Sequence, residues 1–420
     1  MASYDHFAPM PQTAASPPPT AVLIGGVNLV RCLGLAGIRT VVATPDPEEP
    51  ALASRYCTQG VMLPSFDQKD AAIAALERLG ERLARENGTA PALLYGSDDA
   101  LELIYPHRER LGRVFRMLLN DAGVAEALLE KDRFQGFAEA LGLPVPRSLS
   151  WEELAAHEGP VVVKPSAKAD WHASSLKKRV FGDAKALVFD TGAAACAHEG
   201  VALHREALTC QEYIPGDDTC IWSYHAVADE TGAVLDSFIG RKIRTHPPRA
   251  GESAFIEMAH DEGLRELGAR IAAQVPLKGV FKMDFKRDAR TGGWYLLEVN
   301  ARCNLWHYLG AANGINLPAV ACEYLASGRR PATPTRYRAS WRWLSLELDT
   351  RAFLQLRREG ALGLFPWLSS ILFSRNVYNV FSWRDPAPWL RFWRLRLARR
   401  AARGGERVLS TVRQWRSTAS

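Results

Sequence analysis

The chain has 420 residues, of which 47% are hydrophobic and 23% charged, and a formal net charge of +6. This length and composition can bury the cores of several lobes. Its seven cysteines are scattered without a CxxC pair or a metal-ligand spacing, and no hydrophobic signal peptide begins the chain. The sequence therefore argues against a cysteine-bound metal, and we expect a reducing, cytoplasmic environment.

The N-terminal part predicts a parallel sheet. A leader rich in proline, alanine and serine occupies residues 1–20, which we expect to be disordered. Residues 21–47 then predict a strand, a glycine turn, a helix and a second strand. Gly25-Gly26 lacks the third spaced glycine of the dinucleotide fingerprint, so we do not predict NAD here. Asp98 follows a later apolar strand, and we expect it to cap the next helix, with contact to a substrate amine as the alternative.

A short apolar strand at 161–163 delivers Lys164 at its end, and Pro165 stops that strand. A lysine so placed can contact a phosphate, whereas the alternative is a charged residue that protects a sheet edge. The loop at 166–172 has no glycine, so its backbone amides approach phosphate less freely. Three lysines in and after this loop can compensate with charge: Lys168, Lys177 and Lys178.

A second short apolar segment precedes a predicted hinge at Glu212-Tyr213-Ile214. Pro215-Gly216 then breaks the regular structure, and Asp217 and Asp218 follow it. The two acids are either functional or simply terminate the turn. Farther on, an apolar strand is followed by a basic loop with five cationic or titratable side chains: Arg241, Lys242, Arg244, His246 and Arg249. Of these we favour Lys242 as an anion-binding residue.

The stretch from Gly279 to Arg302 predicts a β-hairpin whose turn is Arg290-Thr291-Gly292-Gly293. Pairing Asp284 with Glu298 centres the hairpin on that turn. Because strand side chains alternate, Glu298, Asn300 and Arg302 share one side. Carboxylate and amide oxygens are magnesium ligands, so the pattern favours a magnesium site formed by Asp284, Glu298 and Asn300. The alternative is a solvated polar strand face.

The segment after the hairpin predicts a helix beside the substrate. Asn304, Trp306 and His307 are candidates to shape an acceptor pocket, although a tryptophan is more often part of a core. Cys303 follows Arg302, and we interpret it as a small buried neighbour.

The character of the chain changes beyond about residue 330, where tryptophan and arginine become frequent. From 375 to 420 there are eleven arginines against two acids, a net charge of +9, which leaves −3 for the remainder. The apolar run at 362–373 is shorter than the ~20 residues that span a bilayer. Residues 389–400 resemble an interfacial basic amphipathic segment that binds an anionic membrane surface at its inner, cytoplasmic face. The alternatives are packing on the enzyme itself or on a second subunit. We expect no nucleic acid, because no nucleic-acid-binding module accompanies the charge.

Several of these pieces together resemble the ATP-grasp superfamily, in the order EKDRF with Lys131, VVVKP, QEYIPG, MDF and LLEVNAR. The resemblance covers roughly residues 20–330, and LLEVNAR is its most distinctive part. The basic residues after the hinge are similar to those of D-aspartate ligases and carbamoyl-phosphate-synthase-like proteins. The resemblance implies an α/β and α+β fold in four parts: a leader (1–20), a parallel βαβ domain (21–125), two ATP-grasp lobes (126–330) and a basic helical extension (331–420).

The resemblance also implies roles for single residues. Lys131 and Lys164 would hold phosphate oxygens, and the backbone of Glu212, Tyr213 and Ile214 would pair with the adenine edge. Asp218 would accept hydrogen bonds from the ribose, with Asp217 as the second choice. Three residues would hold magnesium, for which manganese can substitute: Asp284, Glu298 and Asn300. Arg302 and Lys242 would stabilise the charge of the reacting groups.

The activity implied is ATP-dependent ligation, in which a carboxylate is activated as an acyl phosphate and joined to an amine. The sequence does not identify either small-molecule substrate. One alternative is a bicarbonate-activating, carbamoyl-phosphate-synthase-like enzyme. Another is a non-catalytic ATP-binding module that docks to a membrane or a partner protein.

Overall fold

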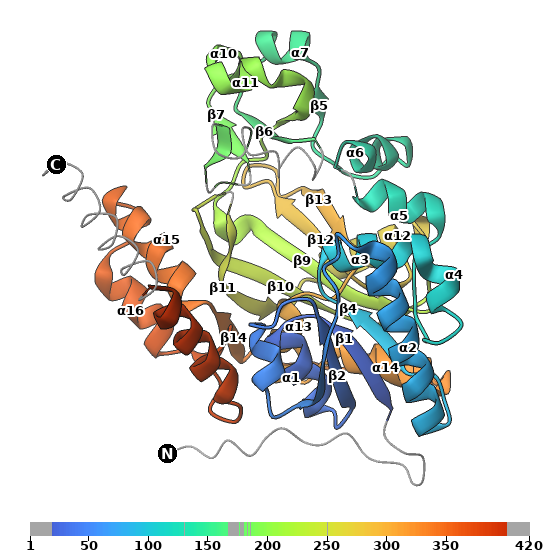
Figure 1. Cartoon of the computed structure of the whole chain (residues 1–420). Coiled ribbons are helices and arrows are strands. Elements are labelled where there is room, and N and C mark those ends of the chain that lie inside the picture. The colour runs from blue at the N-terminus through green and yellow to red at the C-terminus, as the bar shows by residue number, and fades with distance from the viewer. Residues whose placement is uncertain are drawn as a thin grey trace, which may run out of the picture.

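The computed structural model describes residues 19–400 except 130, 167–175, 177–179, 183, 185 and 250, and it describes Lys131 and Asp132 by their backbone alone. Most of the predicted leader, the glycine-free loop after Lys164 and its three lysines therefore lie outside the described residues. The described part contains three β-sheets with helices packed around them (Figure 1).

The first sheet has four parallel strands in the order β3-β2-β1-β4. Residues 21–44 form the predicted strand, helix and strand, so the parallel sheet predicted from the sequence is confirmed. Helix α2 is amphipathic and buries one side, which includes Ile73, Leu76 and Leu83. The strands are β1 (Thr20–Ile24), β2 (Arg39–Thr44), β3 (Cys57–Met62) and β4 (Ala92–Tyr95); the helices are α1 (Val27–Leu35), α2 (Lys69–Asn87), α3 (Asp98–Ile104) and α4 (Arg108–Leu111).

The second sheet is small and antiparallel, in the order β5-β8-β6-β7. It has its own core, which includes Leu154, Val161 and Val163, and it forms the lobe at the top of Figure 1. Its strands are β5 (Ser148–Leu149), β6 (Val161–Pro165), β7 (Leu187–Phe189) and β8 (Leu208–Glu212). The helices before and within this lobe are α5 (Ala122–Leu129), α6 (Lys131–Ala140), α7 (Trp151–Ala156), α10 (Gly192–Ala197) and α11 (Glu199–Leu203).

The third sheet has seven strands in the order β13-β12-β9-β10-β11-β14-β15, and all neighbours are antiparallel except β14 and β15. Its strands are β9 (Ile221–Ala228), β10 (Val234–His246), β11 (Glu252–Ala259), β12 (Gly279–Arg287), β13 (Trp294–Asn300), β14 (Trp341–Leu344) and β15 (Arg375–Tyr378). Helices α12 (Glu262–Gln274), α13 (Trp306–Ala312) and α14 (Leu317–Ser327) pack against it.

One core joins the first and third sheets. Leu23 and Val30 from the first sheet and its helix belong to the same buried cluster as Trp306 and Leu309 from α13. The ring of Trp306 lies so close to Gly240 on β10 that an added Cβ would stand 2.6 Å from it, so only glycine fits there. This packing fixes the end of β4 beside the end of β13.

The segment beyond residue 330 differs from the expected basic helical extension, because two of its strands, β14 and β15, continue the large sheet. Helices α15 (Leu346–Arg358), α16 (Leu364–Leu372) and a helix at 387–400 accompany them on the side of the molecule opposite α2 (Figure 1). The alternative of packing on the enzyme itself is therefore observed for this segment. Within the described residues, no helix is both long and apolar enough to cross a bilayer.

Candidate active site

The predicted hairpin forms with the predicted register. Asp284 on β12 stands opposite Glu298 on β13, and the turn joins strands that end at Arg287 and begin at Trp294. Asn300 donates its amide hydrogen to Glu298 Oε1 at 3.1 Å, and Arg302 Nη2 donates to Asn300 Oδ1 at 3.2 Å. Glu298, Asn300 and Arg302 thus lie on one side of the hairpin. Hydrogen bonds link them into a continuous chain of contacts, which ends at the carboxylates of Glu298 and Asp284.

Asp284 is the buried centre of this chain. Its carboxylate accepts a hydrogen bond from Ser223 Oγ and lies 2.6 Å from Lys282 Nζ. Burial raises the pKa of Asp284; the positive charges of Lys282 and Lys242 oppose this rise, and the adjacent Glu298 adds to it. Two carboxylates held together in this way repel each other and favour a cation between them.

The donor set fits a magnesium ion. It consists of two carboxylates and one amide oxygen, and magnesium completes such a shell with water and phosphate oxygens. Within the described ranges no cluster of three or more His, Cys, Asp or Glu side chains could hold a metal, so this set depends on the amide of Asn300. Lys282 already pairs with one Asp284 oxygen, and this lysine would compete with a metal for that carboxylate.

Arg302 connects the hairpin to the first sheet. Its guanidinium forms a two-point ion pair with Asp98 of α3, with Nη2 3.0 Å from Oδ2. Burial lowers the pKa of Arg302, but the hydrogen bonds to Asp98 together with the negative charges of Asp98, Glu298 and Asp284 outweigh this effect, so the pKa is raised. The expectation that Asp98 caps α3 is wrong, because Ser97 accepts the hydrogen bond of Ala100 N and leaves the Asp98 carboxylate for Arg302.

The candidate phosphate ligands lie on different elements. Lys164 is the fourth residue of β6, close to the strand end as predicted, and Lys242 on β10 contributes to the field at Asp284. Lys131 begins α6, but its side chain is outside the described part. Their contacts with a nucleotide stay predictions.

The hinge segment links the small and large sheets. Glu212 ends β8 and pairs with Arg147 Nε at 2.9 Å, and Tyr213 N donates to Pro160 O at 3.0 Å. Asp218 is buried and accepts from Thr245 N, Thr245 Oγ1 and Arg249 N at 2.8–2.9 Å. Both Asp218 oxygens are therefore engaged within the protein, so a ribose hydroxyl would have to share an acceptor.

Two lysines of the site were not found from the sequence. On β12, Phe281, Met283 and Phe285 are fully buried in the core, so the alternate residues at 282, 284 and 286 face the other way. Lys282 Nζ lies over the ring of Trp306 at 5.1 Å, and Lys286 Nζ lies over the ring of Tyr213 at 4.1 Å. The KxDxK alternation in this strand was the available signal for both lysines.

Three of the residues that follow the hairpin, Cys303, Trp306 and His307, are buried. Trp306 is part of the core, as expected for a tryptophan, and Cys303 is buried with the pKa of its thiol raised to about 12 by burial. Burial also lowers the pKa of His307 to about 3, so its ring is neutral near pH 7. Neither Cys303 nor His307 is therefore charged beside Arg302 at neutral pH.

Lys286 gives a testable dependence of stability on pH. Burial lowers its pKa to about 8, whereas the unfolded chain keeps a value near 10.5. Below pH 8 both states are protonated; between pH 8 and about 10.5 the unfolded state binds more protons, so stability rises with pH. Denaturant titrations should show the stability of Lys286→Met relative to the natural protein declining over this range, by on the order of 2–3 kcal/mol. A difference independent of pH would contradict the lowered pKa.

Comparison with solved structures identifies the class of fold. The L-amino acid ligase from Bacillus licheniformis superposes with a TM-score of 0.52 and 16% sequence identity, and the alignment covers 75% of each chain. The biotin carboxylase domain of the Hydrogenobacter thermophilus 2-oxoglutarate carboxylase, solved with MgADP, ADP and bicarbonate, gives 0.55 and 17%, over 77% of this chain and 73% of that one. The chain therefore has the ATP-grasp fold expected from its motifs.

A sequence comparison points to one particular relative. The D-aspartate ligase of Enterococcus faecium (strain Aus0004) is 24% identical over 277 residues, which cover 62% of this chain and 65% of that protein. The resemblance to the carboxylate-amine ligase group of the ATP-grasp superfamily is thus confirmed. No family model matches the sequence.

Proposed function

We propose that the protein is an ATP-dependent ligase that joins a small-molecule carboxylate to an amine, using ATP and magnesium. The observation that carries this proposal is the chain of contacts from Asp98 through Arg302, Asn300 and Glu298 to Asp284. In this proposal the carboxylate pair would bind a magnesium nucleotide, and the partly buried guanidinium of Arg302 would bind an anionic substrate. The similarity to two ligases that form bonds to amino acids supports the same reaction class.

In the proposed reaction, a carboxylate oxygen of the substrate attacks the γ-phosphorus of ATP, and the bond from that phosphorus to the ADP oxygen breaks. The amine nitrogen then attacks the acyl carbon, the bond from carbon to the phosphate oxygen breaks, and the amine loses a proton. Magnesium, when bound, supplies charge neutralisation for the phosphates. The products are an amide, ADP and phosphate.

The residues of the chain would act by position and charge. Asp284, Glu298 and Asn300 would hold the magnesium, and Arg302, fixed by Asp98, would bind the incoming carboxylate or the charge that develops on the acyl phosphate. Lys282 and Lys242 oppose the rise in the pKa of Asp284, and their positive charge would also attract the phosphates of a nucleotide bound at that carboxylate. The hinge at Glu212, Tyr213 and Ile214 would hold the adenine.

A pooled assay tests the proposal. Pure protein is incubated with ATP, magnesium and pools of amino acids and other carboxylates, and ADP and mass-shifted conjugates are measured. We expect ADP and a conjugate to form in equal amounts, and we expect the formation of both to require magnesium. ADP formed only with bicarbonate would support the carbamoyl-phosphate-synthase-like alternative, and nucleotide binding without any ADP would support the non-catalytic module.

Lys164 gives a test of the nucleotide site. Lys164 lies near the end of β6 in the small sheet, where we propose that it contacts a phosphate of ATP. Lys164→Ala should therefore weaken ATP binding by roughly ten-fold, the effect of losing one charge-assisted hydrogen bond. Lys69→Ala removes an exposed lysine at the start of α2 and serves as the control. Titration calorimetry with ATP and magnesium measures both variants, and equal affinities would remove Lys164 from the site.

A further inference from the structure

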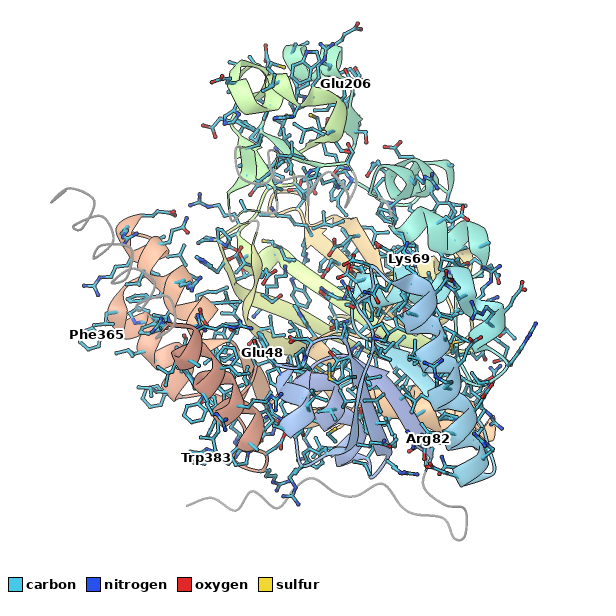
Figure 2. The ribbon with its side chains drawn as sticks, viewed as in Figure 1. Glu48, Lys69, Arg82, Glu206, Phe365 and Trp383 are labelled. Carbon is cyan, nitrogen blue, oxygen red and sulfur yellow. The ribbon has the colours of Figure 1, made fainter. Side chains whose placement is uncertain are left out.

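The segment from 346 to 400, here called the C-terminal extension, concentrates the exposed apolar side chains of the molecule. Among the described residues, eleven of the fourteen large hydrophobic side chains that are exposed to solvent lie in it. Phe365, Phe373 and Trp383 are 82%, 90% and 80% exposed. Figure 2 shows Phe365 and Trp383 at the outer margin of the molecule, on the extension. Exposed apolar side chains gathered in this way mark an interaction surface.

Helix α16 exposes three of its large apolar residues, Leu364, Phe365 and Leu372. Trp367 faces inward, where it stacks on Phe353 at 4.3 Å and donates to Asp349 at 2.8 Å. Phe365 and Leu372, seven residues apart, share the opposite face, and none of the nine residues of α16 is fully buried. A helix of an ordinary soluble enzyme presents the reverse arrangement, with apolar residues toward the core and polar residues toward water.

The helix at 387–400 repeats this arrangement and adds charge. Leu390, Trp393, Arg394 and Leu397 follow each other at helical spacing, and all four are exposed. Its opposite side is attached to the enzyme through ion pairs of Arg396 with Glu347 and of Arg399 with Glu48. The outward stripe therefore combines apolar and cationic side chains.

The outward surface carries little unpaired negative charge, because the two exposed acids of the extension, Glu347 and Glu359, form ion pairs with arginines. Between residues 360 and 400 the sequence contains seven arginines and a single acid, Asp385. That carboxylate is 1% exposed and forms an ion pair with the buried Arg31 at 3.0 Å, so it contributes nothing to the surface. Arg375, Arg394 and Arg400 are exposed. The surface is thus complementary to an anionic partner.

The extension is held firmly on the enzyme, so its outward surface is fixed in place. Asp385 also accepts from Ser54 Oγ and Arg55 N at 2.8 Å, and Asp349 of α15 accepts from Arg244 of β10. Strands β14 and β15 continue the large sheet at the edge opposite the hairpin. A partner bound to the extension would therefore leave the hairpin edge accessible.

We propose that the C-terminal extension docks the enzyme on an anionic phospholipid membrane. Aromatic and aliphatic side chains such as Phe365, Phe373 and Trp383 enter the boundary between headgroups and acyl chains, while the arginines contact the lipid phosphates. A second copy is a poorer occupant, because a two-fold interface would place the same arginine-rich surface against itself. This inference is independent of the proposed ligase activity.

Vesicle flotation with the full-length protein tests the proposal. We expect binding to vesicles of phosphatidylcholine with phosphatidylglycerol at low salt, release at high salt, and little binding to phosphatidylcholine alone. The double variant Phe365→Ser/Phe373→Ser should bind at least ten-fold more weakly. Leu203→Ser, which changes an exposed leucine on α11 of the small lobe, is the matched control and should bind like the natural protein.

Charge is tested separately from apolar insertion. Arg394→Gln should weaken binding to the anionic vesicles about five-fold, as expected for one arginine near such a surface, whereas Arg270→Gln on α12 should not. Absence of flotation at low salt would overturn the proposal. So would equal losses in the variants and their controls, or a dimer in sedimentation velocity that Phe365→Ser/Phe373→Ser abolishes, because the surface would then be a subunit interface.

Discussion

Glu298→Ala is expected to reduce magnesium-dependent ADP formation by roughly 100-fold to 1,000-fold, because charge stabilisation by a metal lowers such a barrier by several kcal/mol. The carboxylate of Glu298 adjoins that of Asp284 and accepts from Asn300, so its removal takes away one of the two acids that would hold magnesium. Asn300→Ala should lower the rate in the same direction, because it removes the amide oxygen of the set.

Neither change opens a core cavity, since Glu298 is exposed and Asn300 is half-buried. Thermal unfolding of both variants should therefore stay close to that of the natural protein. Glu266→Ala, which removes an exposed carboxylate on α12, is the matched control for the rate. Natural rates of ADP release in Glu298→Ala would exclude the hairpin acids as metal ligands.

Asp385→Ala is expected to destabilise the contact between the C-terminal extension and the first sheet by about 3–5 kcal/mol, the usual cost of leaving one partner of a buried ion pair without its counter-charge. Arg31 and Asp385 are both 1% exposed, and Asp385 also accepts from Ser54 Oγ and Arg55 N. Denaturant unfolding followed by tryptophan fluorescence would report the loss, because the extension contains Trp383, Trp389 and Trp393.

Two further variants make this result specific. The double variant Arg31→Met/Asp385→Leu removes both charges and should recover much of the lost stability, since an apolar pair of similar size can replace a buried ion pair. Glu81→Ala changes an exposed acid on α2 and should have no effect beyond about 0.5 kcal/mol. Equal stability of Asp385→Ala and Glu81→Ala would show that the buried pair does not hold the extension.

Local features of this fold could be predicted from the sequence where one segment carries its own signal. The pairing of Asp284 with Glu298 follows from two apolar strands and a glycine turn between them, and the structure has that pairing. The parallel start of the first sheet follows in the same way from strand, turn and helix patterns within 21–47. These patterns depend on neighbours along the chain, so one sequence is sufficient to find them.

Contacts between distant segments could not be predicted in this way. Arg302 and Asp98 are 204 residues apart, and their pairing results from packing of α13 against the first sheet. The hydrogen-bond donors that occupy Asp218 come from Thr245, near the end of β10, and from Arg249, which follows that strand. The sequences of the short strands β14 and β15 have no pattern that distinguishes them from a loop. They form strands because they pair at the edge of the large sheet, β14 with β11 and β15 with β14.

The most direct test of the proposed ligase follows oxygen atoms. A pool of amino acids labelled with oxygen-18 in their carboxylates is incubated with the natural protein, unlabelled ATP and magnesium, and the released phosphate is analysed by mass spectrometry. An acyl phosphate intermediate leaves one substrate oxygen on phosphorus, so we expect one oxygen-18 in each phosphate released with conjugate, and roughly 100-fold to 1,000-fold less labelled phosphate in the same time with Glu298→Ala. Conjugate formed with unlabelled phosphate, or with AMP in place of ADP, would contradict the proposed reaction.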